Sequence, residues 1–99
     1  MNIESRLVIL ANLPQQGSLL EMMTARNIRR KIEFSSEEMN KLNLKEINGR
    51  ISWNSSSSEL LNVDFTDQEK EFLKSIIKIM DSKHIIIDGL LDFIQEIQS

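Results

Sequence analysis

Apolar residues recur every three or four positions along much of this chain, the spacing that places them on one face of an α-helix. Three of these stretches begin with a Ser or Thr followed three residues later by Glu, the capping-box pattern that starts a helix. The capping residues are Ser18, Ser35 and Thr66. The pattern predicts helices at about 19–33, 36–42 and 67–81.

A further helix is expected at about 3–13, before Pro14. Ile3, Leu7 and Leu10 share one stripe at helical spacing and are expected to face the core. The run Leu7–Leu10 taken alone is also typical of a short buried strand, because all four residues are apolar. Its length and the polar residues before it favour the helix.

Between the third and fourth helices the apolar spacing changes to every second residue, as expected for β-strands. Asn48-Gly49 favours the type I′ turn of a hairpin, because both residues readily adopt positive φ. We therefore predict a three-stranded antiparallel meander with strands at about 44–47, 50–53 and 61–65. Trp53 is expected to pack inward, and the polar run Ser55–Ser58 to form an exposed flexible loop.

The end of the chain predicts a helical hairpin. A short polar turn at Asp81–His84 is followed by a second apolar stripe at helical spacing. The residues of this stripe are Ile86, Leu90, Phe93, Ile94 and Ile97. Gly89 within it either lets another element approach closely or is simply tolerated, at a cost of about 1 kcal/mol relative to Ala. Together the elements predict a helix-rich α+β fold, with residues 1–99 forming a single domain.

The composition removes most catalytic and metal chemistry. The chain has no Cys and one His, His84, which excludes thiolate sites and two-histidine metal sites. Its three glycines are isolated, so a glycine-rich phosphate loop is excluded as well. Asp88 and Asp92 lie one helical turn apart, but two carboxylates are too few ligands for a hard cation. We expect no enzymatic activity, cofactor, metal site or small-molecule ligand.

No apolar run approaches the roughly 18–20 residues that cross a bilayer, so we expect a cytoplasmic protein without membrane contact. The net charge of −3 is unevenly distributed. Residues 1–58 carry eight Lys or Arg and six Glu, whereas residues 59–99 carry four Lys and nine Asp or Glu. This asymmetry allows an anion-facing patch in the first part of the chain.

The helix predicted at 19–33 has two contrasting faces. Ala25, Ile28 and Ile32 fall on one side and are expected in the core. The other side is apolar near its start and basic near its end. We predict that it binds a partner, because Met and Arg are enriched where proteins meet. The residues of this predicted surface are Leu19, Met22, Met23, Arg26, Arg29 and Arg30.

Two alternatives for this face remain open. In the first, Leu19 and the methionines pack under the first helix or the C-terminal hairpin, since Met is a common core filler. The arginines would then be solvated or paired with Glu33, Glu37 and Glu38. In the second, the basic segment Arg26–Lys31 contacts nucleic-acid phosphates. The overall acidity and the lack of interleaved aromatic residues count against this nucleic-acid alternative.

Four segments, in this order along the chain, carry a resemblance to other proteins: Arg26–Arg29, Ile32–Glu38, Ile51–Asn54 and Val63–Lys70. In this the chain resembles a set of small, mostly uncharacterised proteins encoded by phages and prophages of low-GC bacteria. The segments contain capping, core and hairpin residues and no catalytic motif. The resemblance implies an intracellular phage or prophage setting. We therefore expect a non-enzymatic protein-interaction module that binds a host or phage protein, or itself as a homo-oligomer.

Overall fold

The computed structural model describes residues 1–53 and 60–98. In this part of the chain most residues are helical, and the remaining regular structure is one small β-hairpin. The helices are α1 (Ile3–Asn12), α2 (Leu19–Ile32), α3 (Ser36–Leu42), α4 (Asp67–Ser82), the short 3₁₀ helix η1 (Asp88–Leu90) and α5 (Leu91–Gln98). The four helices predicted up to residue 81 therefore agree with the structure to within one residue at each end. The alternative prediction of a short strand at Leu7–Leu10 is wrong, because these residues lie in α1.

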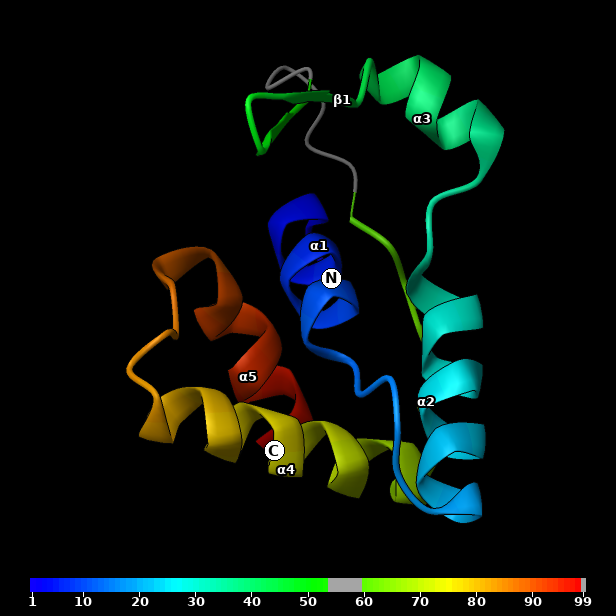
Figure 1. The fold of residues 1–99 in the computed structure, drawn as a ribbon, viewed down its shortest axis with the longest axis vertical. Helices are drawn as coiled ribbons and strands as arrows, with labels where there is room; N and C mark the ends of the chain where they lie inside the picture. Colours follow the sequence, from blue (N-terminus) through cyan, green and yellow to red (C-terminus); the bar gives the residue numbers. More distant parts are fainter. Residues whose placement is uncertain (54–59, 99) are drawn as a thin grey trace.

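The elements form a helical body with an appendage (Figure 1). In the view of that figure α1 lies between α2 and α5, and α4 crosses beneath them. α3 and the hairpin lie together at the opposite end of the molecule from α4. α2 is thus at the edge of the body, where it packs against α4 and, to a lesser extent, α1.

All three predicted capping boxes are present. The hydroxyl oxygens of Ser18, Ser35 and Thr66 each accept a hydrogen bond from the backbone N–H of the Glu three residues later. Each of those glutamates accepts a hydrogen bond from the N–H of its capping residue in return. The local sequence therefore determines where α2, α3 and α4 begin, because each cap satisfies two backbone donors that the helix cannot.

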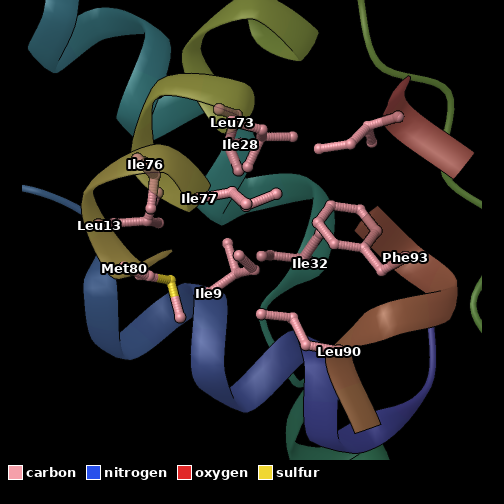
Figure 2. Close-up of a cluster of buried hydrophobic side chains, with 11 residues drawn as sticks. Ile9, Leu13, Ile28, Ile32, Leu73, Ile76, Ile77, Met80, Leu90 and Phe93 are labelled. Carbon is pink, nitrogen blue, oxygen red and sulfur yellow. The ribbon is translucent and has the colours of Figure 1, made fainter. Parts of the chain in front are cut away.

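The core joins all the long helices (Figure 2). Ile9 from α1, Ile28 and Ile32 from α2, Leu73 from α4 and Leu90 from η1 are completely buried in it. α2 thus uses the predicted stripe for the core. α1 does not, because its buried row includes Ile3, Arg6 and Ile9, whereas Leu7 and Leu10 are only half-buried.

The predicted hairpin is confirmed. β1 (Lys45–Ile47) pairs antiparallel with β2 (Arg50–Ser52), and Asn48 and Gly49 both have positive φ, 52° and 78°. Trp53 is half-buried and packs with Ile3, Phe34 and Leu42 in a second, smaller cluster. Trp53 thus turns inward as expected. The predicted loop at Ser55–Ser58 lies outside the described residues.

The prediction of a third strand at 61–65 is wrong, because in the described part of the chain the sheet has two strands. The Leu61 carbonyl accepts a hydrogen bond from the Met1 amino group (2.8 Å), and the Leu61 N–H donates to the Met1 carbonyl (2.9 Å). The alternation itself is real, since Val63 and Phe65 pack on the helical core while Asn62 and Asp64 are exposed. The segment is thus extended, but it pairs with the start of the chain instead of the hairpin.

α5 folds back on α4 as the predicted helical hairpin requires, but it begins later than expected. Residues 85–87 are not helical, and regular α-helix starts only at Leu91. Three consecutive Ile side chains disfavour a helix there, because each is restricted at χ1. Gly89 allows a close approach, since a Cβ at this position would overlap the Glu4 carboxylate. Asn2 and Ser5 of the α1 region both donate hydrogen bonds to the Gly89 carbonyl oxygen, at 3.0 Å.

Candidate functional site

The outer face of α2 carries the six residues predicted to bind a partner. Leu19 is 79% exposed and Met23 55% exposed, whereas Met22 is half-buried. Arg26, Arg29 and Arg30 are all exposed. The alternative in which Leu19 and the methionines pack under the first helix or the C-terminal hairpin is therefore wrong for Leu19 and Met23, whereas Met22 is partly covered. Leu20, which the sequence pattern did not single out, is also exposed, at 62%. We call the six predicted side chains the α2 face.

A shallow depression of about 170 Å³ lies in the middle of the α2 face. Ala25, which is 1% exposed, provides its floor. Its remaining lining residues are Leu19, Met22, Met23, Arg26 and Arg29. Arg30 lies beyond its edge. The depression thus combines apolar walls at the start of the helix with guanidinium groups on the following turns.

No carboxylate in the described part of the chain pairs with Arg26, Arg29 or Arg30. Glu38, one of the partners considered for them, instead pairs with Arg6. Lys31 is not part of the free cationic group, because its Nζ donates to the Glu69 carboxylate and to the Asp64 carbonyl. The basic part of the α2 face therefore consists of three arginines.

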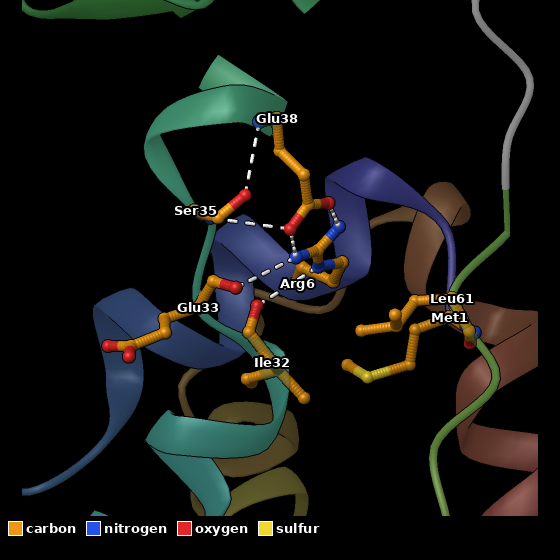
Figure 3. A network of polar contacts seen from close by, with 7 residues as sticks. All are labelled: Met1, Arg6, Ile32, Glu33, Ser35, Glu38 and Leu61. Atoms are coloured by element: carbon orange, nitrogen blue, oxygen red, sulfur yellow. Dashed lines mark hydrogen bonds and ion pairs between the residues drawn. The ribbon is translucent and has the colours of Figure 1, made fainter. Parts of the chain in front are cut away.

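A buried arginine holds the end of α2 where these arginines lie. Arg6 of α1 is 4% exposed and donates to the carbonyl oxygens of Ile32 and Glu33, both at 2.9 Å. Its guanidinium also pairs with both carboxylate oxygens of Glu38, at 2.8 and 3.2 Å (Figure 3). It lies over the Phe34 ring, 3.9 Å from the ring centre. Arg6 therefore ties α1 to the end of α2 and to α3.

Both carboxylates that bind these structural cations have shifted pKa values. The hydrogen bond from Arg6 is the main reason that the pKa of Glu38 lies below its ordinary value of 4.5. Burial of Glu69 raises its pKa, but hydrogen bonds from Lys31 and Thr66 outweigh this effect and leave the pKa lowered. Glu69 thus caps α4 and holds Lys31 of α2 at the same time.

Other candidate chemistry is dispersed. His84 lies exposed in the turn after α4, with a φ of 57°. Asp88 and Asp92 are both exposed. Within residues 1–53 and 60–98, no group of three or more His, Asp or Glu side chains is arranged to hold a metal ion. In the same ranges no helix is long and apolar enough to cross a membrane.

Larger hollows lie away from α2. One, of about 450 Å³, lies between the segment 61–65 and α5 and includes Met1 and Lys70 in its lining. A second, of about 490 Å³, lies between α4 and α5 and is lined by apolar residues together with Lys74, Lys78 and Asp81. A third, also of about 490 Å³, lies between the start of the chain and α5, with Leu60, Asp92 and Glu96 in its lining. The first two hollows mix charges of both signs and the third has acidic residues beside the exposed Leu60, whereas the charged residues of the α2 face are all basic.

The assignment of the α2 face rests on this chain alone, because comparison with known proteins found no relative. No protein-family model matches the chain, and neither a curated protein nor a solved structure matches it. The resemblance to small phage and prophage proteins therefore stays a prediction.

Proposed function

We propose that this chain is a non-enzymatic protein-interaction module that binds another protein through the α2 face. The observation that carries the proposal is the exposure of Leu19 and Met23 next to three arginines that pair with no carboxylate in residues 1–53 and 60–98. Contiguous exposed apolar residues are typical of interaction sites in small proteins. Met and Arg are also the residue types enriched at such sites, whereas Lys and Glu are depleted. The expected partner is a host or phage protein, or a second copy of the chain.

The rigidity of α2 supports this function. The helix is capped at Ser18, its core stripe is anchored by Ile28 and Ile32, and Arg6 and Lys31 attach its second half to neighbouring elements. A face held in this way does not have to be ordered when it binds, so less conformational entropy is lost on association. The exposed side chains are thus presented on a preformed surface.

A charge reversal tests the proposal. Replacing Arg26 and Arg30 by Glu should abolish capture of the partner in pull-downs from cells that express the chain, and any self-association measured by sedimentation. The melting temperature should stay unchanged, because both side chains are exposed. Arg50→Glu combined with Lys78→Glu is the matched control, since it changes the net charge equally at exposed positions away from α2. Equal capture by the Arg26/Arg30 variant would reject the proposal.

Nucleic-acid binding is a second candidate for the same surface, favoured by three exposed arginines within two turns of one helix. Phosphate contacts would make affinity for generic DNA or RNA fall steeply between about 50 and 200 mM salt. The involvement of Lys31 with Glu69 and Asp64 weakens this candidate, because it removes the fourth cation of the basic segment. Absence of binding at low salt would eliminate it.

A further inference from the structure

The α2 face has a chemical polarity along the helix axis. The apolar side chains of Leu19, Met22 and Met23 occupy its first turns, and the arginines follow. At a rise of 1.5 Å per residue, Arg29 and Arg30 lie about 10–12 Å beyond Met22. A ligand that uses both parts must therefore present an apolar group and an anionic group separated by about the same distance.

The depression indicates the size of the apolar group. Its volume of about 170 Å³ is of the order of one large aliphatic or aromatic side chain. Its lining side chains are apolar except for those of Arg26 and Arg29. One anchoring apolar side chain therefore fits it, as at the centre of many protein interfaces.

The arginines indicate the charge of the ligand. A guanidinium group binds a carboxylate through two parallel hydrogen bonds. Glu21, the carboxylate of α2 nearest to the apolar end, already accepts a hydrogen bond from the Ser18 N–H in the cap. As far as the structure describes the chain, no carboxylate balances the cations of the α2 face, and this charge pattern complements an acidic partner.

The backbone of α2 indicates the form of the ligand. Its N–H and C=O groups are used within the helix, so the surface has side-chain contacts to offer but no sheet edge. An extended peptide laid on this face would gain no backbone hydrogen bonds from α2, whereas a helix satisfies its own backbone groups internally. The occupant that fits is therefore a helix.

We infer that the α2 face binds an acidic amphipathic helix of a partner protein, which inserts one large apolar side chain into the depression and places carboxylates about seven or eight residues away, against the arginines. This inference rests on the proposed function and names the partner's chemistry. A nucleic acid is a different outcome of the same test.

A peptide selection tests the inference without a known partner. The probe is a displayed library of helical peptides on an uncharged scaffold, with one central position varied among all residues and the positions seven and eight residues before and after it varied likewise. The intact chain should select Leu, Met or Phe at the centre and Asp or Glu at the outer positions. Both directions are included because a helix can lie parallel or antiparallel to α2.

Charge reversal distinguishes specific peptide binding from nonspecific binding. The Arg26→Glu/Arg30→Glu variant should bind the selected peptides about tenfold or more weakly and, in a fresh selection, prefer Lys or Arg at the outer positions. The Arg50→Glu/Lys78→Glu control should keep the acidic preference. Circular dichroism melting of each variant verifies that it is folded.

Selection of neutral or basic peptides, or no selection at all, would overturn the acidic-helix inference. Partner capture that remains sensitive to Arg26→Glu/Arg30→Glu would in that case leave the proposed function intact. A short DNA or RNA duplex that displaces the selected peptides from the α2 face at 150 mM salt would show that the arginines bind phosphates. That result would overturn the inference in favour of nucleic acid.

Discussion

Arg6 connects the end of α2 to α1 and α3. It contacts the carbonyl oxygens at the end of α2 and the carboxylate at the start of α3, and it is almost fully buried. Its place in the sequence carries a weak signal, since it lies three residues from both Ile3 and Ile9 in the buried row of α1. An arginine in that row is unusual enough to indicate a buried, fully bonded side chain.

Replacing Arg6 by Met should lower the free energy of unfolding by about 2–4 kcal/mol, because two backbone carbonyl groups and Glu38 lose their partner. Urea denaturation measures this change. Arg6→Lys should recover only part of it, since an ammonium group cannot reach all three acceptors with fork geometry. A loss below about 0.5 kcal/mol for Arg6→Met, the range of an ordinary surface substitution, would show that the network does not stabilise the fold.

Glu38 and Glu69 should make the stability depend on pH in the acidic range. Both have pKa values below the ordinary 4.5 in the folded chain, so folding favours their ionised forms. Their contribution is fully present above about pH 4.5 and is lost as the pH falls from there through the lowered folded values. The urea concentration at the unfolding midpoint should therefore decrease as the pH is lowered below about 4.5.

Glu69→Gln provides the control for this pH dependence. The amide keeps the size of the side chain but cannot ionise, so the variant should be less stable at pH 7 and its stability should fall less on acidification. A slope identical to that of the parent chain would mean that other groups cause the acid sensitivity.

At the scale of elements, the two faces of α2 should respond differently to truncation. Ile28 is completely buried, so Ile28→Ala should cost about 2–4 kcal/mol of unfolding free energy. Met23 lies on the same helix but is 55% exposed, and Met23→Ala should change the stability by no more than about 0.5 kcal/mol. Chemical denaturation of the two variants compares them. A large loss for Met23→Ala would place its side chain in the core instead of on the surface.

The helices could be predicted from the sequence because their starts are determined locally. A capping box involves residues only three positions apart, so Ser18, Ser35 and Thr66 act in the same way whatever surrounds them. The Asn48-Gly49 turn is local in the same sense. The core stripe of α2 followed from the helical period once the start of the helix was known.

The third strand could not be predicted because pairing is a competition between distant segments. Leu61–Phe65 has the alternation of a strand, but period two only shows which side chains face the core. The backbone partner of Leu61 is Met1, sixty residues away, and no pattern within the segment identifies it. The hydrogen bonds from Asn2 and Ser5 to the Gly89 carbonyl likewise join segments more than eighty residues apart.

At the scale of the whole molecule, the sequence predicted the six residues of the candidate surface but not their surroundings. Helical period placed Leu19, Met23 and the arginines opposite the core stripe, and the structure shows them exposed. It could not show that α2 lies at the edge of the body, nor that Glu69 takes Lys31 and Arg6 takes Glu38. Those pairings join residues more than thirty positions apart and emerge only when the helices pack.

The most direct test of the α2 face is site-specific photo-cross-linking. A benzophenone amino acid in place of Met23 should cross-link the chain to its partner in cells that express it. Ile79 on α4 is the matched control position, because its exposure of 54% equals that of Met23 within one per cent and it lies on another helix. We predict strong cross-linking from position 23 and little from position 79. Equal cross-linking at both positions, or cross-linking only from position 79, would contradict the assignment of the α2 face as the interaction surface.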